Sequence, residues 1–185
     1  MDRTQRVQLI DDLLPQTQCR RCGYDGCRPY AEAIADGDAN INRCPPGGDT
    51  TLHALAKLLD RPAPTPDTDC GEFGAQKTVW IDPHSCIGCA RCLPPCPVDA
   101  IIGASRQLHV VLDAECTGCE LCIAHCPVDC IVLMDRNERP SPTVAPAREE
   151  NLQRFQAHER RVVQRNERRQ QLLAERKKRA ASLIA

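Results

Sequence analysis

Eight cysteines in the middle of the chain fall into two copies of one pattern. Each copy reads C-x-x-C-x-x-C-x-x-x-C-P, and each cysteine of the second copy follows its counterpart by 30 residues. Thiolates bind soft metal centres, and three of them at such short intervals can bind one centre only from a tight loop. The proline after the fourth cysteine prevents a helix from continuing through it. The two copies comprise Cys86, Cys89, Cys92 and Cys96, and Cys116, Cys119, Cys122 and Cys126.

This spacing favours iron–sulfur clusters over zinc. A pair of zinc sites is the alternative, but three cysteines at consecutive two-residue intervals, followed by Cys-Pro, fit tetrahedral zinc poorly. Gly88 and Gly118 lie inside the loops, where the backbone must pass close to inorganic sulfide and can donate N–H groups to it. The repeat extends beyond the cysteines, since Val-Asp-Ala-Ile at 98–101 recurs as Val-Asp-Cys-Ile at 128–131. We therefore expect two half-domains related by internal duplication.

The double pattern resembles that of bacterial two-cluster ferredoxins, in which the fourth cysteine of each copy reaches across to the other cluster. The resemblance implies two crossed ligand sets for two [4Fe–4S] clusters. One set is Cys86, Cys89, Cys92 and Cys126, and the other is Cys116, Cys119, Cys122 and Cys96. The pseudo-twofold ferredoxin fold would be completed by two short helices, the first shortened by Pro94-Pro95, and by short strands at 79–81, 101–102, 110–112 and 131–133.

A third set of four cysteines lies near the N-terminus, with the spacing C-x2-C-x4-C-x16-C. It comprises Cys19, Cys22, Cys27 and Cys44. By spacing alone, this set suits zinc and an iron–sulfur cluster about equally. The surrounding sequence predicts short helices at 3–14, at 29–35 and from 49 or 50 to 59. Residues 1–60 should therefore form a small helical module around a four-cysteine centre.

Taken together, the twelve cysteines and the Cys-Pro-Pro-Gly at 44–47 resemble the B subunit of the Rnf (or Rsx) electron-transport complex over residues 8–134. The cytoplasmic part of that protein joins the same two kinds of module in the same order. The resemblance implies a third [4Fe–4S] cluster at the N-terminal set. It also implies redox partners of the ferredoxin or flavoprotein type, or Rnf-like subunits. Family members usually begin with a membrane-anchoring helix, which this sequence does not predict.

Composition indicates several small modules with an α+β fold rather than one large core. Among 185 residues, only 3% are aromatic and 15 are prolines. We expect an N-terminal module at 1–60, a proline-rich linker at 61–77, a ferredoxin-like module at 78–136 (the duplicated module), a linker at 137–147 and an extension at 148–185. The start of the chain lacks an apolar signal region, and no run approaches 18 apolar residues. We therefore expect a location in the cytoplasm or on the cytoplasmic face of the inner membrane.

The C-terminal extension carries the opposite charge from the rest of the chain. Residues 148–185 contain 11 Lys and Arg against 5 Asp and Glu, whereas the remainder contains 13 against 20. The absence of glycine and proline from 148 to about 179 favours a long helix. Its apolar stripe is thin, so we expect a solvated helix. The alternatives are docking on an acidic partner or peripheral association with anionic lipid.

The other candidate residues give weaker signals. Cys70 is expected to be an exposed thiol in the linker, and Cys130 a small buried residue beside a cluster, because it takes the position of Ala100. We expect hydrogen bonds or solvent contacts, not metal ligation, for His84, His109 and His125. No catalytic set appears, so the predicted function is transfer of single electrons through three [4Fe–4S] clusters. The alternative is a regulatory or nucleic-acid-binding protein that uses its basic C-terminal helix.

Overall fold

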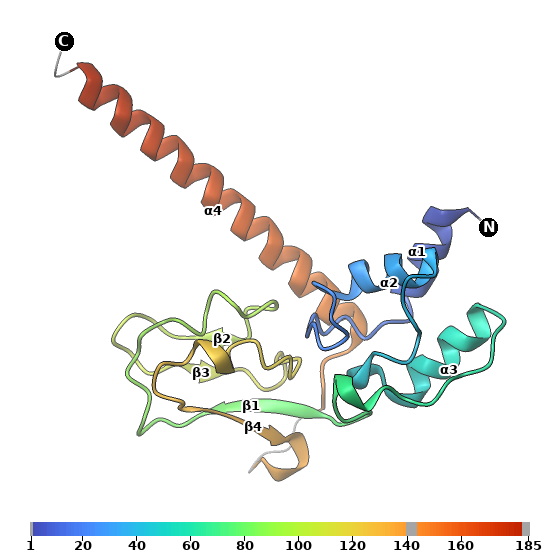
Figure 1. The fold of residues 1–185 in the computed structure, drawn as a ribbon. Helices are drawn as coiled ribbons and strands as arrows, with labels where there is room; N and C mark the ends of the chain where they lie inside the picture. Colours follow the sequence, from blue (N-terminus) through green and yellow to red (C-terminus); the bar gives the residue numbers. More distant parts are fainter. Residues whose placement is uncertain (1, 140–143, 183–185) are drawn as a thin grey trace.

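The computed structural model describes residues 2–139 and 144–182 and places two small modules side by side, with one long helix leaving them (Figure 1). The N-terminal module contains helices, and the duplicated module contains two small sheets. Each module has its own cluster of buried apolar residues. The mixed helix and sheet content agrees with the expected α+β class, while the boundaries of the modules stay predictions.

The N-terminal module holds three helices. These are α1 (Arg3–Asp11), α2 (Cys27–Asp36) and α3 (Gly48–Leu58). Asp2 begins α1 as a capping box, because its carboxylate accepts a hydrogen bond from the Gln5 backbone N–H at 2.8 Å. The helix ends at Asp11, earlier than expected, because the N–H groups of Leu13 and Leu14 bond to carbonyls three residues back and tighten the last turn. The core of the module includes Val7, Ile10, Leu14, Tyr30 and Leu55.

The two sheets of the duplicated module pair strands across the repeat. The strands are β1 (Lys77–Ile81), β2 (Ile101–Ile102), β3 (Val110–Val111) and β4 (Ile131–Asp135). β1 pairs antiparallel with β4, and β2 pairs antiparallel with β3. Each half-domain therefore contributes one strand to each sheet, which ties the two copies into a single unit.

The loops after the cysteine runs contain less helix than expected. In the second copy the expected helix is a single 3-10 turn, η3 (Ile123–His125). At the equivalent place in the first copy, residues 93–95 form a bend followed by a turn, and the structure assigns no helix to this described stretch. Pro94 and Pro95 explain the difference, since neither has the backbone N–H that a helical turn needs.

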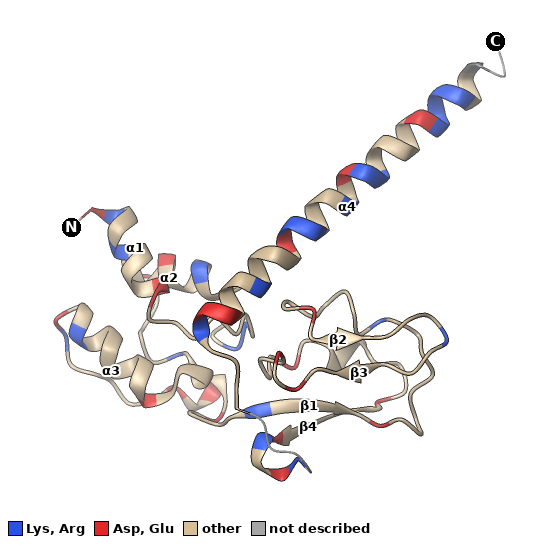
Figure 2. Ribbon diagram, turned by 180° about the vertical axis from the view of Figure 1, so that it is seen from behind, with Lys and Arg blue, Asp and Glu red and all other residues tan. Residues whose placement is uncertain are grey.

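The extension forms one helix, α4 (Arg148–Ser182), as the sequence predicts. One face of its first turns packs across both modules, so this part is not fully solvated as expected. Arg148 bonds to Asp12 of the N-terminal module at 2.8 Å, and His158 bonds to Asp99 of the duplicated module at 2.7 Å. From Val163 to Ala181 every side chain is exposed, and basic residues recur along this part (Figure 2). No described helix is both long and apolar enough to cross a membrane.

Candidate iron–sulfur centres

Each of the three predicted cysteine sets lines one small, partly enclosed cavity. The N-terminal cavity is lined by Cys19, Cys22, Cys27 and Cys44. The Cys86 cavity is lined by Cys86, Cys89, Cys92 and Cys126, and the Cys116 cavity by Cys96, Cys116, Cys119 and Cys122. All twelve predicted residues are thus brought together in sets of four.

The two cavities of the duplicated module show the crossed arrangement. Cys96 belongs to the first copy but lines the Cys116 cavity, and Cys126 belongs to the second copy but lines the Cys86 cavity. All fourteen cysteines of the described chain are free thiols. Four thiols around a cavity of this shape are the donor set that a [4Fe–4S] cube requires, so the residues fit the cluster. Their role as ligands stays a prediction.

The backbone repeats its conformation around the two cavities. The φ angles are +68° at Gly88 and +65° at Gly118, where a side chain would strike the backbone of the facing strand or loop. A Cβ on Gly88 would lie 2.6 Å from the backbone nitrogen of Gln107, and one on Gly118 would meet the carbonyl oxygen of Lys77, which lies 30 residues before Gln107. The tight loops therefore depend on both glycines.

Backbone N–H groups point at the fourth cysteine of each copy in the same way. The N–H of Ala100 donates to Cys96 Sγ over 3.2 Å, and the N–H of Cys130 donates to Cys126 Sγ over 3.3 Å. Such bonds stabilise a thiolate and raise the potential of a cluster that it binds, because they favour the more negative, reduced state.

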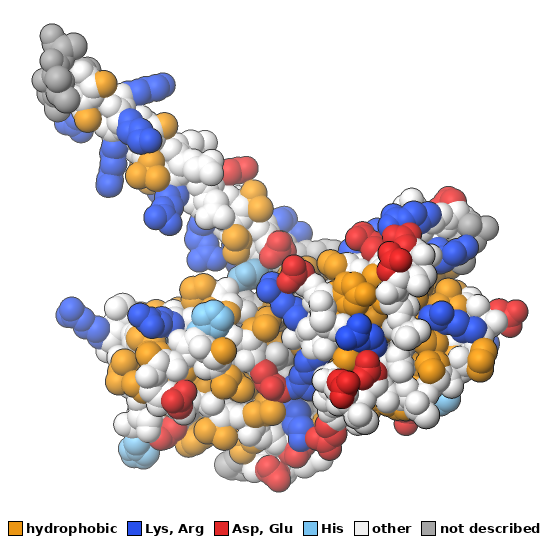
Figure 3. Space-filling model, viewed as in Figure 1, with side chains coloured by type: hydrophobic (Ala, Val, Ile, Leu, Met, Phe, Trp, Pro, Cys, Tyr) orange, Lys and Arg blue, Asp and Glu red, His pale blue; other side chains and the backbone are white. Residues whose placement is uncertain are grey.

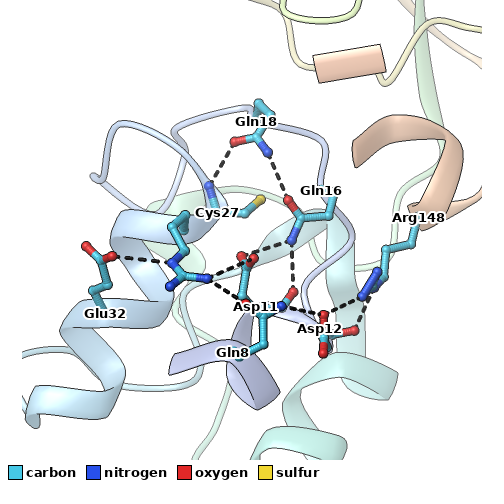
Figure 4. Close-up of polar contacts among 9 residues, drawn as sticks. Gln8, Asp11, Asp12, Gln16, Gln18, Cys27, Glu32 and Arg148 are labelled. Carbon is cyan, nitrogen blue, oxygen red and sulfur yellow. Dashed lines mark hydrogen bonds and ion pairs between the residues drawn. The ribbon is translucent and has the colours of Figure 1, made fainter. Parts of the chain in front are cut away.

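Buried side chains that the sequence did not single out position two of the sites. In the N-terminal module, Gln18 accepts a hydrogen bond from the backbone N–H of Cys27 at 2.9 Å and donates to Gln16 at 2.9 Å (Figure 4). Gln16 in turn donates to the Asp11 carbonyl at 2.8 Å.

In the duplicated module, the buried Arg136 donates to the backbone carbonyls of Asp113 and Cys116. No sequence signal marks these residues, because a glutamine or arginine is usually exposed.

Burial raises the pKa of most of these thiols, which disfavours their ionisation when no metal is bound. It raises the pKa of Cys27 and of Cys119 to about 12, and that of Cys92 to about 11. A bound iron centre supplies the positive charge that holds such cysteines as thiolates, and its binding would release their protons. At Cys126, burial also acts to raise the pKa, but N–H groups of Val128 and Cys130 bring it below its ordinary value.

The linings of the two equivalent cavities differ in polarity, and two of the differences place polar groups beside the Cys86 cavity. His109 and Cys130 line the Cys86 cavity, where Val79 and Ala100 line the Cys116 cavity. Cys130 is buried as expected, and its sulfur lies 3.4 Å from that of Cys126. His109 is only 1% exposed, and its Nε2 has no hydrogen-bond partner among the described residues, so the expected hydrogen bond or solvent contact is not seen at that atom.

Cys70 corrects a prediction, since it is buried and not an exposed linker thiol. It ends a 3-10 turn, η2 (Thr68–Cys70), and the following Gly71 packs near Pro45 and Arg21. Linker composition misled the prediction because it does not reveal that this turn folds back onto the N-terminal module.

The N-terminal module covers the outer loop of the Cys116 cavity. The Thr117 hydroxyl donates to the Thr17 carbonyl at 3.1 Å, and each of these threonines lines the cavity of its own module. Arg21 forms an ion pair with Glu120, and both side chains are partly buried. The N-terminal cavity and the Cys116 cavity thus face each other across this contact.

Two family models match the modules that hold the cavities. A family of Fe-S cluster domains matches residues 14–46, which include the whole N-terminal set. The family described as 4Fe-4S dicluster domain matches residues 79–133, which include all eight cysteines of the duplicated module. The matches support iron–sulfur clusters, with [4Fe–4S] clusters in the duplicated module.

Three known proteins similar to the chain share one name, the B subunit of the ion-translocating oxidoreductase complex. That of Hahella chejuensis is 59% identical over 106 residues, which are 57% of this chain and 53% of that protein. The protein of an Azoarcus species is 55% identical over 58% of each chain, and that of Alkalilimnicola ehrlichii is 58% identical over 57% of this chain and 58% of its own. The chain thus spans little more than half the length of these relatives. Over that part it is a homologue of the B subunit of the ion-translocating oxidoreductase complex, which confirms the resemblance seen in its sequence.

Proposed function

We propose that this protein transfers single electrons through three [4Fe–4S] clusters, as a redox component of a complex like that of its relatives. The observation that carries the proposal is the grouping of twelve cysteines, four at a time, around three cavities. The chain supplies ligands, burial and hydrogen bonds that set the potentials, and a bound cluster supplies the one-electron couple. The redox partners would be ferredoxin- or flavoprotein-type carriers or Rnf-like subunits.

The contacts between the modules support a linear order for the three centres. The Thr117–Thr17 hydrogen bond joins the walls of the N-terminal and Cys116 cavities. The crossed cysteines Cys96 and Cys126 join the Cys116 and Cys86 cavities. The proposed sequence of centres is therefore N-terminal, Cys116, Cys86, with the Cys116 centre in the middle.

An electron-exchange experiment tests this function. The protein is purified without oxygen, reduced with dithionite and mixed with an oxidised low-potential carrier, while cluster absorbance and paramagnetic spectra are recorded. We expect all three centres to be reoxidised by one electron each. The carrier is used in excess and has a midpoint potential well above those of the centres. Centres that nevertheless stay reduced would contradict electron transfer and favour a structural or sensory role.

A further inference from the structure

The duplication presents two equivalent loops, and only one of them is covered. Loop 117–120 lies under the N-terminal module, through Thr117 and Glu120. The equivalent loop 87–90 forms no hydrogen bond or ion pair with the N-terminal module or α4 within the described residues. Cys89 is the one exposed cysteine among the fourteen, all of which the structure describes, whereas its counterpart Cys119 is buried.

The open loop combines apolar and basic side chains. Ile87 is 59% exposed, and Leu108 on the neighbouring loop is 46% exposed. Arg91 and Arg106 are the only charged side chains at 83–98 and at 100–112, and neither forms an ion pair with a described residue. The N–H of Arg106 donates to the Gly88 carbonyl at 2.8 Å, so this loop lies against the cluster loop. Figure 3 shows hydrophobic side chains gathered over this module, with basic side chains at its outer end.

We propose that the surface formed by loop 87–91 and Arg106 is the docking site of an acidic electron carrier, a protein whose redox centre lies near a negatively charged surface. The covered loop is the precedent, since there a neighbouring module brings its own cluster cavity to the loop and pairs charges across the contact. At the open loop the chain supplies the cations, so the partner must supply carboxylates. This inference rests on the proposed function and identifies where electrons enter or leave it.

The exchange at this surface is a one-electron step. A reduced carrier would lose one electron to a cluster held by Cys86, Cys89, Cys92 and Cys126. Electron transfer of this kind forms and breaks no bond, so the docking site would have only to bring the two centres close together. The exposure of Cys89 leaves little protein between that centre and a bound partner.

Charge reversal at the loop tests the docking site. In the full-length, cluster-loaded protein, Arg91→Glu with Arg106→Glu should slow electron transfer from a reduced acidic bacterial ferredoxin by about tenfold or more at low salt, the usual scale of electrostatic steering. The difference should shrink as salt is raised. Arg168→Glu with Arg169→Glu is the matched control, because it changes the net charge equally on the exposed part of α4. Transfer from neutral or cationic dyes, such as methyl viologen, should not slow in either variant.

The other outcomes separate this inference from the function itself. Equal rates with ferredoxin in the loop variant and the wild type would overturn the docking site while leaving electron transfer intact. An equal loss in the control would place docking on α4 and also overturn it. Self-association that the loop variant abolishes in sedimentation would overturn it too, by showing that a second copy occupies the surface. Failure of the wild type to exchange electrons with any donor would instead contradict the proposed function.

Discussion

The two halves of the duplicated module have nearly the same backbone and different surroundings. The φ angles of Ala90 and Glu120 are +59° and +65°, and those of Asp99 and Asp129 are +50° and +51°. Yet the Cys116 half is covered by the N-terminal module, and Val79 and Ala100 line its cavity at the positions that His109 and Cys130 take in the open Cys86 half. The backbone thus forms two similar cysteine-lined cavities. A few side chains distinguish the Cys116 centre, in the middle of the proposed sequence, from the Cys86 centre at its end.

Removing a crossed cysteine should have the largest effect on the two halves. Cys96→Ala removes one of the four thiols that line the Cys116 cavity, although Cys96 belongs to the first copy. We expect about four iron atoms to be lost and the paramagnetic signal of the Cys116 centre to disappear or change, because one of its four ligands is gone. The matched variant Cys126→Ala should affect the Cys86 centre instead. Loss of the Cys86 signal in Cys96→Ala would show that the ligand sets are not crossed.

Removing the cover should make the Cys116 half resemble the open half. Arg21→Glu places two carboxylates at the contact with Glu120, and like charges at an interface cost several kcal/mol. We expect the Cys116 centre to react with ferricyanide about tenfold faster or more, and the exposed Cys86 centre to react as before. The swapped variant, Arg21→Glu with Glu120→Arg, should restore the wild-type rate. An unchanged rate in the single variant would mean that the ion pair does not hold the cover.

Replacing His109 and Cys130 by the residue types of their counterparts, Val79 and Ala100, should bring the potentials of the two halves closer together. A hydrogen bond from either side chain to a bound cluster, worth ~1 kcal/mol in the reduced state, corresponds to about 40 mV for a one-electron couple. His109→Val and Cys130→Ala should therefore each lower the potential of the Cys86 centre by up to about 40 mV in a titration followed by paramagnetic spectra. The control Ile102→Val, on the exposed face of β2, should leave it unchanged. Unchanged potentials in both lining variants would show that the sequence difference between the cavities has no electronic effect.

Shortening α4 in two steps should have the smallest effect and separates its packed turns from its exposed part. Deleting 163–185 removes described side chains that are all exposed, so cluster content and protease resistance should not change. Deleting 148–185 also removes the contacts of Arg148 with Asp12 and of His158 with Asp99. We expect faster cleavage after Glu72, in the linker, by a glutamate-specific protease, with all clusters kept. Equal cleavage of the two truncated proteins would show that α4 does not hold the modules together.

The sequence predicted what depends on regular spacing. The cysteine sets and the strands at 101–102 and 131–133 follow from periodic patterns, and the structure places them as expected. It did not predict the buried positions of Cys70 and His158, because each depends on a contact between segments far apart in the chain. The packing of α4 was missed for the same reason, since its apolar stripe is thin and polar side chains such as Arg148 and His158 bond it to the two modules.

Metal analysis of anaerobically purified full-length protein tests the central claim most directly. Three sets of four thiols around three cavities predict about twelve iron atoms and about twelve sulfides per chain, all in [4Fe–4S] clusters by Mössbauer spectroscopy. About eight irons with one equivalent of zinc, and the loss of that zinc in Cys27→Ser, would contradict the account by showing that the N-terminal set is a zinc site.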